Sequence, residues 1–388
     1  MLFYTDLRIF FLLHITAGSA SPLSQQPLLG STVDPFPVYW QNDTVCAANS
    51  SHFVGTVPVA QSRGLFFWFV ESRDDPIASP TIIWLNGGPG ASSLVGLFEE
   101  IGPCRMSTLS ETLPNPHSWS EYANLLFLDQ PSGTGLSASS SPVTTLHTAS
   151  LDFSTFVKRF TRQYPQYFAK GLFIAGESFG GIYVPRFTSD IVQEQLSFRE
   201  GALEVPIHGI ILVDALVDGA SSPLGHYEMF CTGEAEFPVH FNQSTCDAIA
   251  MAMPEAERLQ HLCQSTQDPY VCSTSHEFGL NNIYRYLQEQ EVDTRRRSPY
   301  DLRLPCGEDR FCIPKSPISI EHHLNRPEIQ RRLGLRQPVE YVSINFSLNA
   351  AFTAHPENLI PTTREVTFLL DEGELSVLVM NGNFDAVM

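Results

Sequence analysis

The sequence feature that most constrains the fold is a short apolar run, Leu172–Ala175, that ends in Gly176–Gly180 (Gly-Glu-Ser-Phe-Gly). An apolar segment of helical character follows from Ile182. A strand, a sharp turn centred on a serine and then a helix form the pattern of a nucleophile elbow. The serine backbone is strained in such a turn, so its neighbours must be small, and Gly176 and Gly180 meet that need. An ordinary strand-to-helix turn fits the same pattern, so the rest of the chain must decide.

Other segments alternate between strand and helix character. Aromatic residues recur at helical spacing from Phe153 to Phe168 and predict a helix that faces the core. Two runs separated by Gln61–Gly64 predict a hairpin. The expected strands are His52–Ala60, Leu65–Ser72, Thr81–Leu85, Asn124–Leu128, Ile207–Val213 and Leu375–Met380. This alternation predicts the α/β class, with a mostly parallel sheet covered by helices on both faces.

The alternation fades from about Ser221 to Pro314. The segment contains six of the eight cysteines, namely Cys231, Cys246, Cys263, Cys272, Cys306 and Cys312. Their spacing does not match a zinc site, so we expect an insertion after the Ile207–Val213 strand that is stapled by disulfides. Beyond it, His322 and His323 could imitate a metal cluster, but adjacent residues point apart on a helix. We therefore predict a polar surface there, and neither a metal site nor a cofactor.

The N-terminal residues and the cysteines indicate the compartment. Residues 1–20 have the pattern of a signal peptide, because an apolar run, Leu7–Ile15, precedes small residues that end at Ala20. The even number of cysteines is typical of an oxidising environment. Asn-x-Ser/Thr glycosylation acceptors begin at Asn42, Asn49, Asn242 and Asn345. Together these features predict a secreted or vacuolar glycoprotein.

Charge and hydropathy exclude two classes of partner. The formal net charge is −19, and the densest basic run, Arg295–Arg297, is short and lies among polar residues. We therefore expect no nucleic-acid partner. No segment after the leader has the length of a membrane helix, so we expect no stable membrane insertion. The sequence does not predict an oligomeric state.

Two loops that follow expected strands carry candidate functional groups. Asn86–Ser93 contains three glycines around Pro89, which allows backbone N–H groups to approach a ligand closely. It could be a phosphate cradle, but it lacks the Gly-Lys-Ser/Thr ending of that motif, so an oxyanion hole fits better. Asp129 could be a catalytic acid, but its position two residues before Pro131 favours a role in stabilising a turn.

Several motifs together resemble those of the serine carboxypeptidases, particularly the fungal ones. The motifs are Ile83–Gly90, Asp129–Pro131 with Gly133–Gly135, Gly176–Ser178, and Pro299–Arg303 followed by Cys306 and Cys312. The resemblance extends from about His52 to the end of the chain. It implies an α/β-hydrolase fold over residues 21–388, with an insertion at about 221–314. In that fold the catalytic residues occur in the order serine, acid, histidine.

The resemblance also implies roles for individual residues. Ser178 would attack the last peptide carbonyl and form an acyl-enzyme, and Asp385 would orient the catalytic histidine. The backbone N–H groups of Gly88 and Phe179 would form the oxyanion hole. The free carboxylate of a peptide or protein C-terminus would be held by Asn86, Glu100 and Glu177. A Cys306–Cys312 disulfide is expected.

The two glutamates make physical sense only if they are protonated. Like charges raise each other's pKa, and a protonated carboxyl can donate a hydrogen bond to a carboxylate. We therefore expect exopeptidase activity that is favoured by acid and fades towards neutral pH. Alternatively, Glu177 is a solvated turn residue and Glu100 forms an ion pair on a helix.

The chain departs from the family pattern at several positions. Ala91, Phe179 and Ser132 replace the usual cysteine, tyrosine and aliphatic residue. The family's catalytic histidine lies after the Asp385 position, whereas this sequence stops at Met388 and its last histidine is His355. We therefore expect a C-terminally truncated chain. It would be poorly active, because loss of a triad member leaves little catalysis, and marginally stable, because the final helix of the fold would be missing and part of the sheet exposed.

Three other functions remain open at this point. A lipase or esterase shares the fold but has no need for the Asn86, Glu100 and Glu177 set. An acyltransferase on the same scaffold shares every motif and differs in transferring an acyl group from an acyl-glucose. A non-catalytic binding protein is favoured only by the missing histidine.

Overall fold

The chain divides into two compact units, residues 1–34 and 35–388. The computed structural model describes residues 35–137, 139–232, 240–289, 297–306 and 319–387, all in the second unit. The expected signal peptide, residues 1–20, and Cys312 lie outside the described residues.

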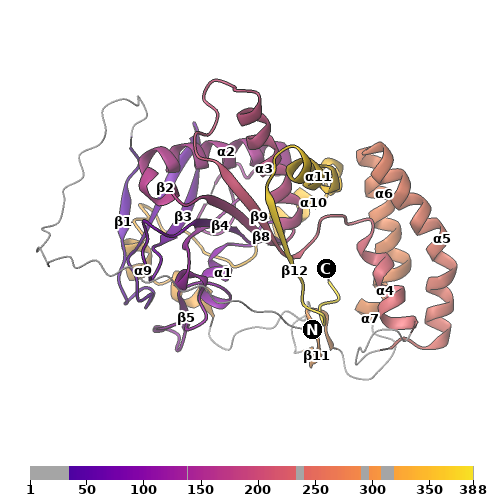
Figure 1. Ribbon diagram of the computed structural model, residues 1–388. Helices are drawn as coiled ribbons and strands as arrows, with labels where there is room; N and C mark the ends of the chain where they lie inside the picture. Colours follow the sequence, from indigo (N-terminus) through magenta and orange to yellow (C-terminus); the bar gives the residue numbers. More distant parts are fainter. Residues whose placement is uncertain (1–34, 138, 233–239, 290–296, 307–318, 388) are drawn as a thin grey trace, which may run out of the picture. The chain divides into compact units, whose positions relative to one another are not determined.

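An eight-stranded sheet forms the centre of the second unit (Figure 1). In sheet order the strands are β1 (Val38–Trp40), β2 (His52–Ala60), β3 (Arg63–Val70), β7 (Asn124–Leu128), β4 (Thr81–Leu85), β8 (Leu172–Ser178), β9 (Ile207–Ala215) and β12 (Ser376–Met380). The first three strands and the β3–β7 pair are antiparallel, whereas β7, β4, β8, β9 and β12 run parallel. The mostly parallel α/β sheet predicted from the sequence is confirmed.

Helices cover both faces of this sheet, as the labels in Figure 1 show. One hydrophobic cluster includes residues of α2 (Leu146–Gln163), α3 (Gly180–Leu196), α10 (Phe346–Thr353) and α11 (Thr363–Asp371). The other includes residues of α1 (Leu94–Glu99), α8 (Ile320–Leu324) and α9 (Pro327–Arg332). Buried strand residues supply much of the rest of each cluster, which is typical of a parallel sheet covered on both sides.

The predicted aromatic helix is confirmed as α2, but it is shorter than expected. Thr145 caps its start by accepting a hydrogen bond from Thr148 N, and it ends at Gln163. Pro165 follows, and the residue before a proline disfavours helical backbone. Tyr167 and Phe168 therefore lie in a separate 3₁₀ turn, η2 (Pro165–Phe168), although both still pack into the core.

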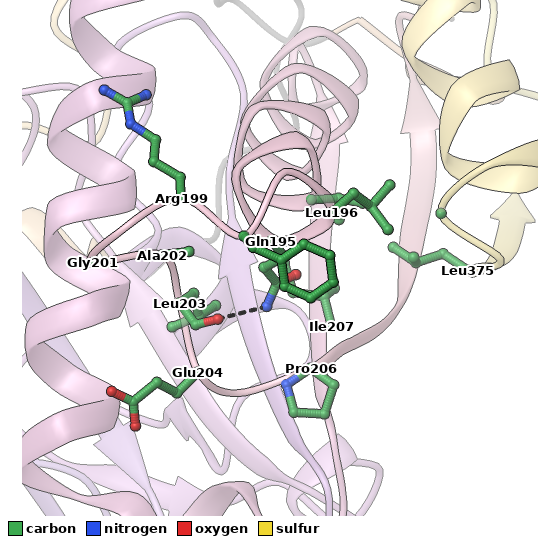
Figure 2. A pocket seen from close by; sticks show the side chains of 13 residues that line it. Gln195, Leu196, Arg199, Gly201, Ala202, Leu203, Glu204, Pro206, Ile207 and Leu375 are labelled. Carbon is green, nitrogen blue, oxygen red and sulfur yellow. Dashed lines mark hydrogen bonds between the residues drawn. The ribbon is translucent and has the colours of Figure 1, made fainter.

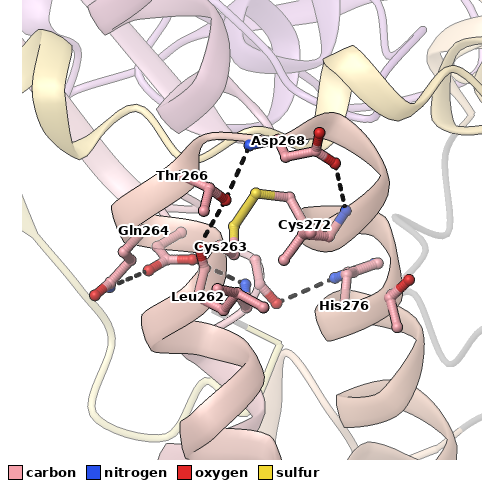
Figure 3. Close-up of a disulfide and its surroundings, with 12 residues drawn as sticks. Leu262, Cys263, Gln264, Thr266, Asp268, Cys272 and His276 are labelled. Carbon is pink, nitrogen blue, oxygen red and sulfur yellow. Dashed lines mark hydrogen bonds between the residues drawn. A yellow bond between two sulfur atoms is a disulfide. The ribbon is translucent and has the colours of Figure 1, made fainter.

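The segment after β9 is a disulfide-stapled insertion, as predicted, and most of its described part is helical. It contains α4 (Ser222–Cys231), α5 (Gln243–Thr266), α6 (Pro269–Gly279), the π-helix η3 (Leu280–Tyr284), α7 (Arg285–Glu289), β10 (Arg297–Ser298) and β11 (Asp301–Pro305). Two disulfides join its helices, Cys231–Cys246 and Cys263–Cys272. Figure 3 shows the second, which clamps the turn between α5 and α6.

A further disulfide, Cys46–Cys104, joins the segment before β2 to β5 (Cys104–Met106), which pairs with β6 (Thr112–Pro114). The sequence did not predict this pairing. Cys306 is disulfide-bonded, but its expected partner Cys312 is not among the described residues, so that bridge stays a prediction. The short helices η1 (Trp119–Glu121) and η4 (Pro356–Leu359) complete the described elements.

The predicted polar surface at His322 and His323 is wrong for one of the two residues. His322 is exposed, but His323 is fully buried. The Nε2 atom of His323 lies 3.0 Å from the carbonyl oxygen of Val45, which is 278 residues away in the chain. A partner so distant in sequence leaves no local pattern.

A hollow of about 680 Å³ lies where β9 begins and where the chain enters β12 (Figure 2). Ile207 and Leu375 line it, together with Leu196, Phe198 and Leu203 from the end of α3 and the following loop. Ligands of open α/β sheets bind at the carboxyl ends of the strands. This hollow lies at the amino ends, so the candidate site is elsewhere.

Candidate active site

The elbow predicted at Ser178 is present. Ser178 is the last residue of β8, α3 begins two residues later, and the Ser178 backbone has φ of 57°. A non-glycine residue in this left-handed region is strained. The Ser178 carbonyl accepts a hydrogen bond of 2.8 Å from Leu216 N. An ordinary turn would not place a serine in this conformation at the carboxyl end of a central strand, so the elbow interpretation is favoured.

The glycine-rich loop after β4 packs directly onto the elbow. A Cβ atom added to Gly87 would lie 2.4 Å from Phe179 N and 2.6 Å from the Glu177 carbonyl oxygen. Only glycine permits so close an approach to backbone atoms. The next residue, Gly88, is exposed and has φ of +99°. The two segments that carry the expected oxyanion donors, Gly88 and Phe179, are therefore adjacent.

Asn86, Glu100 and Glu177 are brought together from β4, the end of α1 and β8. Asn86 Nδ2 donates to Glu177 Oε2 at 2.6 Å and to Glu100 Oε1 at 3.2 Å. The alternatives of a solvated turn for Glu177 and an ion pair for Glu100 are therefore not supported. The three residues form one polar cluster, which we call the carboxyl cluster.

The orientation of Asn86 is fixed by residues that sequence reasoning missed. Its Oδ1 atom accepts hydrogen bonds from Trp84 Nε1 at 2.8 Å and from Gly96 N at 3.1 Å. Because the oxygen is occupied by two donors, the NH₂ group must face the glutamates. The available signal was that Trp84 and Asn86 are two residues apart, so that both lie on one side of a strand.

Burial and mutual charge hold protons on the carboxyl cluster. Loss of solvent, and then the charge of Glu177, raises the pKa of Glu100 well above its usual value. Loss of solvent, and then the charge of Asp214, raises the pKa of Glu177 to about 7. A hydrogen bond between the two carboxyls raises the pKa of Glu100 and lowers that of Glu177, as expected if Glu100 is the donor. Below about pH 7 the cluster can therefore donate hydrogen bonds.

Asp129 stabilises loops, as predicted, and lies outside the carboxyl cluster. Its fully buried carboxylate accepts from Ser92 Oγ at 2.7 Å, Ser93 N at 2.9 Å and Leu136 N at 2.7 Å. Burial raises its pKa to about 6, against the effect of these hydrogen bonds. Asp129 thus joins the loop after β4 to the turn that follows Gln130 and Pro131.

Asp385 lies on the loop that follows β12. It is partly buried, its N–H donates to the Gly382 carbonyl at 3.1 Å, and its Oδ1 accepts from Val387 N at 2.6 Å. Its charge also contributes to the raised pKa of Glu177. The serine and the acid therefore come from the carboxyl ends of β8 and β12, with β9 between them.

The hydrogen bonds of the described histidine side chains go to residues other than Ser178. Three of these histidines illustrate this. His52 Nδ1 accepts from Trp68 Nε1 at 3.0 Å, and His226 Nε2 lies 2.8 Å from the Ala386 carbonyl oxygen. His276 Nδ1 lies 3.1 Å from the Gly219 carbonyl oxygen (Figure 3). These residues do not provide the base that the serine needs.

The four glycosylation acceptors differ in exposure. Asn42, Asn49 and Asn242 are exposed, whereas Asn345 is partly buried. The Asn345 Nδ2 atom already donates to the Gly133 carbonyl at 3.0 Å, and its Oδ1 caps α10. A glycan on Asn345 would therefore compete with internal hydrogen bonds, and the other three positions remain the better predictions.

The described residues contain no group of three or more His, Cys, Asp or Glu side chains that could hold a metal ion. None of their helices is both long enough and apolar enough to cross a bilayer.

The chain is similar to known proteins along most of its length. A family model described as serine carboxypeptidase matches residues 42–388. "Carboxypeptidase Y homolog A" of Leptosphaeria maculans is 31% identical over 327 residues, and that of Paracoccidioides brasiliensis is 32% identical over 328 residues. In both cases the match covers 84% of this chain and 57% of the relative. The chain thus spans a little over half the length of these curated relatives.

The fold has also been solved in another protein. A crystal structure of Kex1Δp, a prohormone-processing carboxypeptidase from Saccharomyces cerevisiae, superposes with a TM-score of 0.76. The superposition covers 90% of this chain and 78% of that one, at 19% sequence identity. At this identity the likeness establishes the α/β-hydrolase fold alone.

Proposed function

The chain belongs to the serine carboxypeptidase family, and on that premise we propose that it releases amino acids one at a time from the C-termini of peptides. The observation that carries this proposal is the carboxyl cluster beside Ser178. A serine hydrolase that cuts internal bonds or esters has no use for three polar groups gathered beside its nucleophile. An enzyme that must recognise a free C-terminal carboxylate needs such groups.

Ser178 is the proposed nucleophile. Its hydroxyl would attack the last peptide carbonyl and form an acyl-enzyme, with release of the terminal amino acid. The negative charge that develops on the carbonyl oxygen would be stabilised by the N–H groups of Gly88 and Phe179. The N-terminus of α3, which begins at Gly180, points its partial positive charge at the same place. Asp385 would orient the histidine that acts as general base.

The carboxyl cluster would provide the exopeptidase specificity. A substrate carboxylate can accept hydrogen bonds from protonated Glu100 and Glu177, with Asn86 holding both in place. Deprotonation of Glu177, whose pKa is raised to about 7, would put a negative charge against the substrate. Substrate affinity should therefore be high in acid and should fall as the pH rises through about 7.

The rate of peptide cleavage depends on the general base. A general base must take the proton of the Ser178 hydroxyl, and we propose that this base is a histidine oriented by Asp385. Substrate recognition does not depend on the base and should be intact.

The disulfides indicate the cellular compartment of the protein. The described residues contain three disulfides, Cys46–Cys104, Cys231–Cys246 and Cys263–Cys272. Disulfides persist in secreted and lumenal proteins and are rare in the cytosol. We therefore place the protein in the secretory pathway, either secreted or in a vacuole-like compartment.

The activity can be tested with an N-acylated dipeptide, whose release of the C-terminal amino acid is followed by mass spectrometry at pH 5. We expect release that is abolished in Ser178→Ala. The same peptide with a C-terminal amide should not be cleaved. Release that survives in Ser178→Ala, or equal cleavage of the amide, would contradict the proposal. Transfer of an acyl group from an acyl-glucose without peptide cleavage would indicate an acyltransferase instead.

A further inference from the structure

Asp214 lies at an irregularity in the sheet beside the elbow. In the β8–β9 pairing Glu177 faces Val213, but the next residue, Ser178, faces Ala215. Asp214 is therefore the extra residue of a β-bulge. Bulges change the direction in which a side chain points, and they often occur next to active sites. Asp214 also has φ of 40°, a strained value for a residue with a side chain.

The bulge directs the Asp214 carboxylate to the loop after β12. Asp214 Oδ1 accepts a hydrogen bond of 2.5 Å from Gly382 N. The Gly382 carbonyl in turn accepts from Asp385 N at 3.1 Å. Two consecutive hydrogen bonds thus connect the end of β9 to the backbone of the proposed catalytic acid.

Further contacts of this loop come from the insertion. Leu302 N donates to the Phe384 carbonyl at 3.0 Å, and Ala386 N donates to the Pro299 carbonyl at 2.8 Å. The hydrogen bond from Gly382 N to Asp214 Oδ1 links this loop to β9, the strand beside that of the nucleophile. Asp214 is thus well placed to set the position of Asp385 relative to Ser178.

The same carboxylate also acts on the carboxyl cluster. The groups that face Glu177 are Asn86 from the end of β4, Glu100 from the end of α1, Asp214 from β9 and Asp385 from the loop after β12. The negative charge of Glu99 in turn raises the pKa of Glu100. No lysine or arginine forms an ion pair with Glu177 or Asp214 in the described residues. The charge on Asp214 therefore favours protonated Glu177.

We propose that Asp214 is a positioning residue with two tasks. Its hydrogen bond to Gly382 places the Asp385 loop, and its negative charge extends the pH range over which the carboxyl cluster binds a substrate carboxylate. The first task rests on the β-bulge and on the hydrogen bond between Asp214 Oδ1 and Gly382 N. The second rests on the proposed function, because it presumes that Glu177 contacts the substrate.

Two substitutions separate the tasks. Asp214→Asn keeps an oxygen acceptor for Gly382 N but removes the charge, and Asp214→Ala removes both. Glu374→Gln is a matched control. Glu374 is an exposed carboxylate with φ of 53°, and it lies just before the start of β12, at the end away from Gly382. All are made in the 388-residue protein carrying Ser178→Ala, so that the dipeptide ligand is bound without turnover.

The first readout is hydrogen–deuterium exchange at residues 381–386, measured by mass spectrometry. Asp214→Ala should exchange at least about tenfold faster than the parent, because the hydrogen bond that protects Gly382 N is lost. Asp214→Asn and Glu374→Gln should stay within about threefold of it. Unchanged exchange in Asp214→Ala would overturn the positioning role.

The second readout is the pH at which half of the affinity for the N-acylated dipeptide is lost, measured by calorimetry. In Asp214→Asn this midpoint should move down by about half a pH unit, because removal of a like charge lowers the pKa of Glu177. Glu374→Gln should leave it unchanged. An unmoved midpoint in Asp214→Asn would overturn the electrostatic role. If the parent protein itself does not prefer the carboxylate to the amide, the proposed function fails, and the exchange experiment still decides the positioning role.

Discussion

Ser178 and Asp385 follow two strands of one sheet, yet these strands have different surroundings. β8 lies between β4 and β9, and most of its residues are buried. β12 pairs only with β9 among the described strands, and Leu378, Val379 and Met380 are 51%, 62% and 43% exposed. The nucleophile is therefore held by close packing of backbone against backbone. The loop that carries the acid is hydrogen-bonded to Asp214, Pro299 and Leu302 through Gly382, Ala386 and Phe384.

This difference shows that the two halves of the site should respond to different perturbations. A side-chain atom added to the closely packed half should destabilise it. In the half that is held by hydrogen bonds, a substitution that keeps the hydrogen-bond acceptor should have little effect. Substitutions in the packed half should therefore have the largest effects, and changes in the insertion or in the charge of Glu177 should have smaller ones.

The largest effect is expected for Gly87→Ala in the packed half. The new Cβ would lie 2.4 Å from Phe179 N and 2.6 Å from the Glu177 carbonyl oxygen, and backbone atoms in a buried sheet cannot move aside cheaply. We expect a loss of about 3 kcal/mol or more in the free energy of unfolding, measured by denaturant titration, and loss of dipeptide binding.

Gly225→Ala is the control for that substitution. Gly225 is exposed within α4, and no atom lies within 4 Å of its added Cβ. Its unfolding free energy should change by less than about 1 kcal/mol, in the stabilising direction. If Gly87→Ala behaves like Gly225→Ala, the loop after β4 does not pack on the elbow as described.

A smaller, local effect is expected in the insertion when Cys263 and Cys272 are both replaced by serine. This disulfide closes a short loop between α5 and α6 (Figure 3), so its loss should cost about 2–3 kcal/mol, by the loop-entropy argument. Limited proteolysis should become faster within α5 and α6. Affinity for the dipeptide should stay within about twofold, because the carboxyl cluster comes from the sheet and α1. A larger loss of affinity would show that the insertion supports the site directly.

The smallest effect concerns the pH dependence of stability. The folded-state pKa of Glu177, about 7, exceeds its ordinary value of 4.5. The native state therefore holds a proton that the unfolded state has lost, and stability falls as the pH rises from about 4.5 through 7. Glu177→Gln should remove about 1–2 kcal/mol of this fall between pH 5 and pH 8, since the carboxyl is partly open to solvent. Denaturant titrations at both pH values test this, and a fall as steep as in the parent would refute the raised pKa.

Residues whose roles depend on neighbours in the sequence were predicted well. The strands Thr81–Leu85 and Asn124–Leu128 match the structure residue for residue, because fully buried parallel strands are short apolar runs. The elbow was recognisable because its strand, serine and glycines are contiguous. The cluster of Asn86, Glu100 and Glu177 was predicted only through the family resemblance, and the structure then brought the three side chains together.

Features built from distant segments could not be predicted in this way. The burial of His323 depends on Val45, and the Cys46–Cys104 bridge joins residues 58 positions apart. Asp214 was missed because its bulge is defined by the pairing of β8 with β9 and not by the β9 sequence. The internal order of the insertion was missed because its helices pack around a small cluster of their own, where neither strand alternation nor a long apolar stripe signals the fold.

The most direct test of the central claim is whether the site recognises a free carboxylate through protonated side chains. Calorimetry on the Ser178→Ala protein should compare the N-acylated dipeptide with its C-terminal amide at pH 5 and at pH 8. We predict at least about tenfold tighter binding of the carboxylate at pH 5, equivalent to about 1.4 kcal/mol. This preference should nearly disappear at pH 8, where Glu177 is ionised. Equal affinities at pH 5, or a preference for the carboxylate that grows towards pH 8, would contradict the account.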